Sequence, residues 1–375
     1  MNKKLHILFL CSWYPSEVFP TNGDFIQRHA EAVALQHRVS VLHMVSDKTI
    51  STSTIKIETI NNVTSYIGYV KYTSNSVLKM LRFFAMYKRL LKKIGFFDLV
   101  HLNVLFPFGI FALHLKYFKK KTYLISEHWS GYLTANSKAF SWREKLISKY
   151  IVKKAKYICP VSTFLREEMQ SIGFKGNYKV VPNVINTHIF KPSHSSKEEN
   201  LTVVHISNFD TAKNVAEMLK AAKLLEDIVP NVAWKFIGGT GAAYQKLIAN
   251  LDFKTANIVF INHLSQEALA THIQSATICV SFSKYETFGI TTLEAISCGT
   301  QAITTNTGIV RELEKSNYLS VVNYNDVTGL TNKILEIYQQ QQKENTTEMH
   351  RFIEAHFSPK VVSALFSDLY FKALY

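Results

Sequence analysis

Two glutamates flank a Phe-Gly step in the stretch Tyr285–Ala295, which reads YETFGITTLEA. The apolar run Ala276–Phe282 before it predicts a buried strand, and the pattern over Thr291–Ser297 predicts a short helix. Glu286 therefore falls in the strand-to-helix loop, and Glu294 falls one turn into the helix. Both carboxylates are expected near the amide groups that begin the helix.

The start of this helix has the features of a phosphate site. The backbone N–H groups of Phe288, Gly289 and Ile290 would lie at the helix N-terminus, beyond the carboxyl end of a strand. Unpaired amides and the helix dipole favour an anion there, and Gly289 permits close approach of a ligand. Because like charges repel, Glu286 and Glu294 are expected to accept hydrogen bonds from hydroxyls on the two sides of a diphosphate, namely a sugar and a ribose.

Each carboxylate also has a purely structural interpretation. Thr291-x-x-Glu294 fits a capping box, in which Glu294 bonds only the amide of Thr291. Glu286 fits a solvated loop carboxylate. The combination of strand, glutamate spacing, central glycine and helix start favours the ligand-binding interpretation.

Strands alternate with helices along the whole chain. Helical patterns such as Gly23–Leu35 and Val215–Leu225 separate the apolar runs, which predicts parallel sheets covered on both faces in doubly wound units. The predicted strands are Leu5–Cys11, Arg38–Met44, Leu99–Val104, Thr122–Ser126, Tyr157–Val161, Thr202–Ile206, Ala233–Ile237, Ile258–Ile261, Ala276–Phe282 and Gln301–Thr304.

A polar stretch with Pro182 and Pro192 divides these strands into two series. We therefore predict an N-terminal Rossmann-like domain over 1–185 and a linker over 186–200. A second Rossmann-like domain follows over 201–358, and a closing helix over 359–375 packs back on the first domain.

The charge balance is strongly basic, with 43 Lys and Arg against 28 Asp and Glu, a net of +15. Such a balance favours anionic partners: nucleic acid, an acidic membrane surface or phosphorylated ligands.

The four cysteines are scattered along the chain and form no Cys/His cluster, so we expect them to be reduced and packed in the interior, and we expect no zinc site. No Asp-x-Asp motif occurs, so no dedicated divalent-metal site is indicated.

Two apolar segments imitate membrane signals. Leu5–Cys11 follows two lysines but is short and lacks a small-residue cleavage site, so a first strand is favoured over a signal peptide. Leu99–Leu115 is interrupted by polar and helix-breaking residues, which favours a strand, a turn and a helix over a membrane span.

The segment Asn75–Phe97, in contrast, has the pattern of a helix that can lie in the interface of an anionic membrane, because its cations border an apolar stripe. Lys116–Lys121 adds a further basic run. The alternative is a core helix with a solvated basic face.

The segment SKYETFGITTLEAISCGTQAI resembles the E-x7-E signature of family 4 glycosyltransferases, which are retaining enzymes of the GT-B fold. Thr287 stands where the family usually has glycine. The resemblance extends to WYPSEVFPTNGDFIQRHAEAVA, with Gly23 and Asp24, and to ISEHWSGY, with His128. It also covers the linker VVPNVINTHIF and the segment VVHISNFDTAKN, where Lys213 matches a family lysine.

The resemblance implies two Rossmann-like doubly wound parallel-sheet domains facing a central cleft, with the C-terminal helix crossing back. It implies transfer of a sugar from a nucleoside diphosphate sugar to an acceptor hydroxyl, with no cofactor and no metal. His128 and Glu286 would be catalytic. The donor-binding residues would be Gly23, Asp24, Asn208, Lys213, Phe288, Gly289, Ile290 and Glu294.

One family position differs. Asn208 stands where an arginine usually contacts the diphosphate, so a charge-assisted contact is missing. Either Asn208 makes a weaker neutral bond to the diphosphate, or another cation such as Lys284 compensates.

We expect a cytoplasmic enzyme that visits the inner membrane face. Its acceptor would be a saccharide or a lipid-linked saccharide, and it would serve cell-surface polysaccharide, lipopolysaccharide or glycolipid assembly.

Other classes explain less of the sequence. A nucleic-acid-binding protein would account for the charge, but no helix-turn-helix, zinc or RNP-type motif occurs. A GT-B sugar epimerase or phosphorylase would account for both halves but not for the E-x7-E segment. GGTGAAY at Gly238–Tyr244 lacks the third glycine of a dinucleotide fingerprint, which argues against an oxidoreductase. A catalytically inactive scaffold that binds at a membrane remains an alternative because of Asn208.

Overall fold

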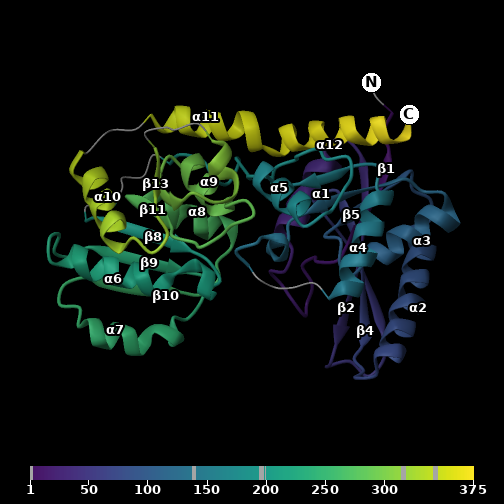
Figure 1. The fold of residues 1–375 in the computed structure, drawn as a ribbon, viewed down its shortest axis with the longest axis horizontal. Coiled ribbons are helices and arrows are strands. Elements are labelled where there is room, and N and C mark those ends of the chain that lie inside the picture. Colours follow the sequence, from purple (N-terminus) through teal and green to yellow (C-terminus); the bar gives the residue numbers. More distant parts are fainter. Residues whose placement is uncertain (1–2, 137–140, 194–197, 199, 314–317, 341–344) are drawn as a thin grey trace. The chain divides into compact units, whose positions relative to one another are not determined.

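The computed structural model describes residues 3–136, 141–193, 198, 200–313, 318–340 and 345–375 (Figure 1). The chain divides into two compact units. Unit 1 comprises Met1–Val184 and Pro359–Tyr375, and unit 2 comprises Ile185–Ser358. The expected linker, 186–200, therefore belongs to unit 2 by its contacts, and its residues 194–197 and 199 lie outside the described residues.

Unit 1 contains a seven-stranded sheet in the order β3-β4-β2-β1-β5-β6-β7. All neighbouring strands are parallel except β3 and β4, which form an antiparallel hairpin. The strand order reverses at β1, so ligands are expected beyond the carboxyl ends of β1 and β5. The strands are β1 His6–Cys11, β2 Arg38–Asp47, β3 Thr54–Ile60, β4 Val63–Lys71, β5 Leu99–Asn103, β6 Tyr123–Glu127 and β7 Ile158–Pro160.

The helices of unit 1 cover this sheet, and the last of them comes from the end of the chain. Helix α12 packs along α1. The Tyr370 hydroxyl lies 2.7 Å from Nδ1 of buried His101, and Ser367 Oγ lies 2.9 Å from Nε2 of His37, so polar bonds fix the position of α12. The helices are α1 Asp24–Ala34, α2 Ser76–Ile94, α3 Gly109–Lys119, α4 Trp142–Lys154, α5 Thr163–Ser171 and α12 Pro359–Leu374, with a 3-10 turn at Ser130–Tyr132.

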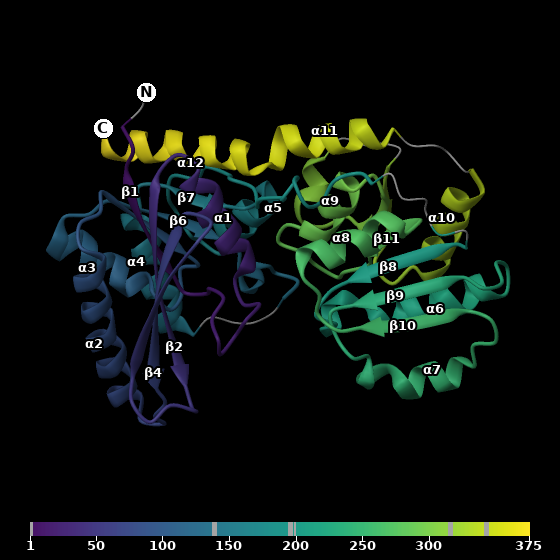
Figure 2. The ribbon, with the colours of Figure 1, turned by 180° about the vertical axis from the view of Figure 1, so that it is seen from behind.

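Unit 2 contains a six-stranded parallel sheet in the order β10-β9-β8-β11-β12-β13. Figure 2 shows β8, β9 and β10 side by side. Buried rings such as Trp234, Phe236 and Phe282 fill its core. The elements are β8 Thr202–Ile206, α6 Val215–Glu226, β9 Ala233–Ile237, α7 Gln245–Leu251, β10 Asn257–Ile261, α8 Gln266–Ser275, β11 Ile278–Ser281, α9 Ile290–Ser297, β12 Gln301–Thr305, β13 Leu319–Val322, α10 Val327–Gln340 and α11 Thr346–Phe357, with 3-10 turns at Thr211–Lys213, Ala242–Tyr244 and Gly308–Glu312.

The four cysteines are free and buried. No helix within the described ranges is both long enough and apolar enough to cross a membrane. The residues described here also contain no group of three or more His, Cys, Asp or Glu side chains able to hold a metal ion.

Buried neutral histidines predict how stability depends on pH. Burial lowers the pKa of His29, His43 and His205 to about 4. The unfolded chain therefore binds more protons than the folded chain between about pH 6.5 and 4, and the free energy of unfolding falls as the pH falls through this window. Each histidine should contribute about 1.4 kcal/mol per pH unit. Chemical denaturation at a series of pH values should show this slope; a stability that is flat from pH 7 to 4.5 would contradict the assignment.

Candidate functional site

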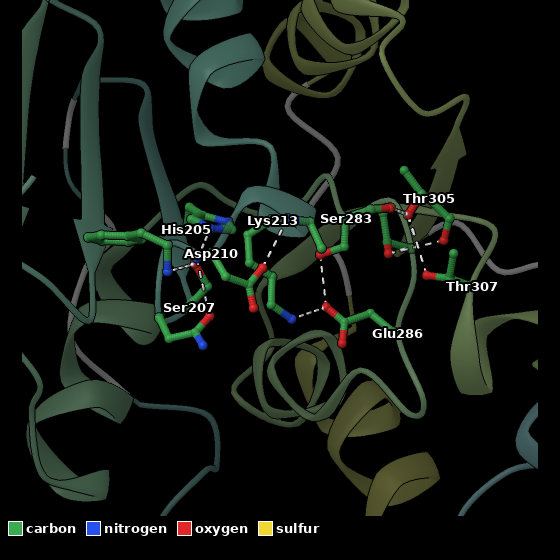
Figure 3. A network of polar contacts seen from close by, with 12 residues as sticks. His205, Ser207, Asp210, Lys213, Ser283, Glu286, Thr305 and Thr307 are labelled. Atoms are coloured by element: carbon green, nitrogen blue, oxygen red, sulfur yellow. Dashed lines mark hydrogen bonds and ion pairs between the residues drawn. The ribbon is translucent and has the colours of Figure 1, made fainter. Parts of the chain in front are cut away.

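A polar network lies at the carboxyl ends of β8, β11 and β12, where the strand order of unit 2 reverses (Figure 3). His205 of β8 is 2.8 Å from Ser207 Oγ, which accepts a hydrogen bond from the Phe209 amide. Thr305 Oγ donates to the Ser283 carbonyl at 2.6 Å. These bonds fix the loops after all three strands, at the edge where open α/β sheets bind ligands.

Lys213 and Glu286 meet at the centre of this network. Lys213 Nζ lies 2.6 Å from Glu286 Oε1, and Ser283 Oγ donates to the same oxygen at 2.8 Å. Burial acts to lower the pKa of Lys213, but the charge and hydrogen bond of Glu286 outweigh it, so the pKa is raised. Lys213 is therefore a fixed, permanently charged cation beside the loop that leads into α9. The structure thus brings together two predicted site residues that are 73 positions apart.

Helix α9 begins as expected for an anion site. Gly289 occupies the N-cap with φ 96°, a left-handed conformation that favours glycine, and no side chain caps the helix. No hydrogen bond within the described part of the chain occupies the N–H of Gly289 or Ile290. Phe288 is buried, and its carbonyl accepts from the Ile309 amide at 2.9 Å. Two helix-start amides are thus available to a ligand.

The capping-box alternative for Glu294 is wrong. Because the N-cap is Gly289, Thr291 lies inside the helix and cannot serve as the capping residue. Glu294 is only 1% exposed, and its charge raises the pKa of Cys279 on β11, after the larger effect of burial. The carboxylate therefore lies between α9 and the sheet.

The segment after β8 holds the departure from the family pattern. Asn208 is exposed, and its side-chain oxygen accepts a long bond of 3.4 Å from the Asp210 amide. The Lys284 amide donates to the Ala212 carbonyl at 2.7 Å, which joins the Lys284 loop to the loop of Lys213. The Lys284 side chain is exposed. A second cation is therefore carried on the adjoining loop.

In unit 1, Gly23 is the N-cap of α1 with φ 80°. A side chain there would place its Cβ 2.8 Å from the Trp13 carbonyl carbon, so both conformation and space require glycine. Asp24 begins the helix; its carboxylate accepts from the Phe25 amide at 2.8 Å and lies 3.5 Å from Arg28. These contacts of the Asp24 side chain are with residues of its own helix, α1, whose first turn they stabilise.

His128 follows β6 and is 6% exposed. Its ring packs 4.6 Å from Phe25 and 5.3 Å from His29, measured between centroids. Neither ring nitrogen has a hydrogen bond of normal geometry to a described residue. Burial, followed by the nearby His29 and His101, lowers its pKa well below the usual range. His128 is thus a neutral imidazole; the Asn183 side chain acts to raise its pKa but forms no hydrogen bond of normal geometry with either ring nitrogen.

Sequence reasoning missed the carboxylate that positions this histidine. Glu127 is fully buried, and its Oε1 accepts from the His128 amide at 2.8 Å and the Trp129 amide at 3.1 Å. Its Oε2 accepts from the Leu105 amide and the Tyr132 hydroxyl, both at 3.0 Å. Glu127 therefore ties the loop after β6 to the loop after β5. A charged residue inside the predicted strand-end segment ISEHWSGY was the available signal.

Two family matches divide the chain in the same way as its two sheets. Residues 25–189 match "Glycosyltransferase Family 4", and residues 186–356 match "Glycosyl transferases group 1". A curated relative, N-acetyl-alpha-D-glucosaminyl L-malate synthase of Bacillus anthracis, is 25% identical over 191 residues. That match spans 49% of this chain and 49% of the relative, about half of its length.

Solved structures share the fold over nearly the whole chain. Sucrose-phosphate synthase from Thermosynechococcus elongatus has a TM-score of 0.80 at 17% identity, covering 98% of this chain and 99% of its own. Anabaena HepE in complex with UDP and glucose has a TM-score of 0.72 at 13% identity, covering 97% and 99%. The fold is the GT-B fold, with two parallel-sheet α/β units. The chain belongs to the glycosyltransferases of the family 4 type.

Substitutions of the two glutamates in the E-x7-E segment should have different effects on nucleotide binding and on donor turnover. Glu294→Ala and Glu294→Gln are expected to weaken binding of a nucleoside diphosphate about tenfold, as loss of one hydrogen bond to a charged group implies. Glu286→Ala should mainly reduce turnover of the sugar donor. Calorimetric titration with the diphosphate measures the first effect, and steady-state rates with the sugar donor measure the second. Parent-like affinity in both Glu294 variants, together with parent-like turnover in Glu286→Ala, would refute the assignment.

Proposed function

We propose that the protein transfers a sugar from a nucleoside diphosphate sugar to an acceptor hydroxyl with retention of anomeric configuration. The observation that carries the proposal is the Lys213–Glu286 pair beside the open N-terminus of α9. A cation and free amides converge at a strand-end edge, which suits a diphosphate leaving group. Because HepE was crystallised with UDP and glucose, a UDP-sugar is the first donor to test.

The residues then take distinct parts in the reaction. The bond from the anomeric carbon to the diphosphate oxygen breaks, and Lys213 and the amides of Gly289 and Ile290 stabilise the charge that develops on that oxygen. The acceptor oxygen attacks from the same face, and its proton passes to the departing diphosphate. Glu286 and His128 would contact the sugar. The chain's own cation and amides are proposed to neutralise the leaving group without a metal.

The acceptor that we favour is a lipid-linked saccharide at the inner face of a membrane. Unit 1 has 29 Lys and Arg against 11 Asp and Glu (29 − 11 = +18), whereas unit 2 has 14 against 17 (14 − 17 = −3). Of the large apolar side chains that the described residues expose, 20 belong to unit 1 and 4 to unit 2. Cations interleaved with exposed apolar groups favour an anionic membrane surface. Such an acceptor fits glycolipid, lipopolysaccharide or cell-surface polysaccharide assembly.

A panel of UDP-, GDP- and ADP-sugars tests the donor. A donor that binds only the folded protein should raise the melting temperature by mass action, and incubation with membrane lipids should then release the free nucleoside diphosphate. A protein that binds a donor but never releases the diphosphate would support the second candidate, an inactive scaffold, which Asn208 at the arginine position favours. Absence of any shift across the panel would overturn both.

A further inference from the structure

An apolar pocket of about 700 Å³ lies in unit 1, and none of its lining residues belongs to unit 2. It lies between α2, the end of β2 and the segment from Phe106 to Phe111. Aromatic rings line it from both sides, with Phe83 and Phe84 on α2 and Phe106, Phe108 and Phe111 opposite. A volume of this size matches that of a single small-molecule ligand.

The wall formed by this segment is fixed by hydrogen bonds. Ser12, directly after β1, donates from Oγ to the Val104 carbonyl at 2.7 Å and accepts from the Phe108 amide at 3.1 Å. Leu105 donates to Glu127 at 3.0 Å. Val104 itself has φ 60°, an unusual conformation for a β-branched residue that these bonds maintain. The pocket is therefore formed before any ligand arrives.

The same bonds connect the pocket to the predicted site residues of unit 1. Glu127 holds both Leu105, at the start of the pocket wall, and the amide of His128. Asn22 lines the pocket and directly precedes Gly23. A ligand whose chain fills the pocket would thus carry its polar end beside the loops that the resemblance assigns to the sugar phosphate.

The lining of the pocket includes a cation. Lys79 lines the pocket and forms no ion pair with any residue that the structure describes. Helix α2 has six basic residues and no acidic residue. Met80 and Leu81, also in the lining, are 60% and 57% exposed, so a ligand can enter past apolar groups.

We propose that this pocket binds the hydrocarbon chain of a single-chain lipid phosphate that carries the acceptor, with Lys79 facing the phosphate. This inference rests on the proposed glycosyl transfer and names its acceptor class. The volume suits one small-molecule ligand, the ring-lined wall suits hydrocarbon, and Lys79, which has no ion pair to a described residue, suits an anionic head group. A diacyl lipid presents two chains, and a free phosphate presents none.

Calorimetric titration of the full chain with farnesyl phosphate, without any sugar donor, tests the pocket directly. Leu81→Glu should weaken binding at least tenfold, because it places a carboxylate in the apolar lining. Val77→Glu is the matched control, since Val77 lies one turn earlier on the same face of α2, is 63% exposed and does not line the pocket. It should bind farnesyl phosphate like the parent. Equal weakening by both substitutions would overturn the pocket and leave only a charged surface.

Further ligands separate the possible sources of affinity. Dodecyl phosphate should bind, whereas inorganic phosphate and a short-chain phosphatidic acid should bind at least tenfold more weakly; equal affinity for either would overturn the single-chain assignment. Lys79→Ala should reduce affinity for farnesyl phosphate but not for farnesol. Because donor binding is measured separately by thermal shift, failure of farnesyl phosphate to bind a chain that still binds a sugar donor would refute the pocket and leave the proposed transfer intact.

Discussion

Lys213→Ala is expected to lower kcat/KM for the sugar donor by about 10²- to 10³-fold, the usual effect of removing one fixed group that stabilises developing charge. The side chain is held at 2.6 Å by Glu286, and its pKa is raised, so it is charged at every physiological pH. Asn208 cannot supply the missing charge, because it is a neutral amide. Removal of Lys213 therefore leaves the helix amides and the exposed Lys284 as the remaining groups of this predicted site that can face a diphosphate.

The effect must be separated from simple loss of an ion pair. Lys220→Ala removes an exposed lysine that pairs with Glu217 at 2.8 Å in the same unit, and it should leave kcat/KM unchanged. Lys213→Arg should restore part of the rate. Glu286→Gln in the Lys213→Ala background should not cost the full sum of the two single effects, because the groups act together. Steady-state kinetics of these four variants and of Glu286→Gln alone would contradict the role if Lys213→Ala matched Lys220→Ala.

The sequence predicts the two sheets well because their central strands are buried on both faces. Runs such as Thr202–Ile206 and Ala233–Ile237 are mostly apolar, with His205 and Lys235 as interruptions, and the structure has strands with these same bounds. The glycine-led start of α9, where we propose that a phosphate binds, was also predictable. A parallel strand followed by glycine and a helix leaves few other arrangements for the amides.

The edges of the sheets were not predictable in the same way. No strand was predicted over β3 or β4: β3 is almost entirely exposed although Ile55 and Ile57 alternate with polar residues, and β4 was missed although most of it is buried. The pairing of β3 with β4 depends on Asn61 and Asn62, which adopt φ of 50° and 63° in the connecting turn. Asparagine tolerates this conformation, so an Asn-Asn pair was the available turn signal. Strand β13 is only partly buried and was missed for a related reason.

The spacing of residues in the sequence does not show which buried polar side chains are hydrogen-bonded in the fold. Two buried histidines of unit 1 illustrate the point: both ring nitrogens of His101 have hydrogen-bond partners, whereas neither nitrogen of His128 has a hydrogen bond of normal geometry to a described residue. Both occur within or after apolar runs, and their sequence environments are similar. The difference arises from residues far away in the chain, since Tyr370 on α12 bonds His101 across 269 positions. That difference supplies a test of function.

His128→Phe is expected to abolish most transfer activity while making the protein more stable. Phenylalanine keeps a ring against Phe25 and His29 but removes two buried nitrogens that have no normal hydrogen bond in the described chain. Removing an unsatisfied buried polar group should raise the free energy of unfolding by about 1 kcal/mol. If the ring nitrogens contact the transferred sugar, kcat should fall by about 10²- to 10³-fold.

His101→Phe is the matched control for this change. His101 is as deeply buried as His128, but its nitrogens lie 2.7 Å from the Tyr370 hydroxyl and 2.7 Å from Ser126 Oγ. The substitution leaves two buried hydroxyls without their partner and should lower the free energy of unfolding by about 2 kcal/mol. Chemical denaturation and initial rates of both variants decide the matter. If His128→Phe lost stability and kept its rate, His128 would be a packing residue, because only a group retained for its chemistry combines higher stability with lost activity on removal.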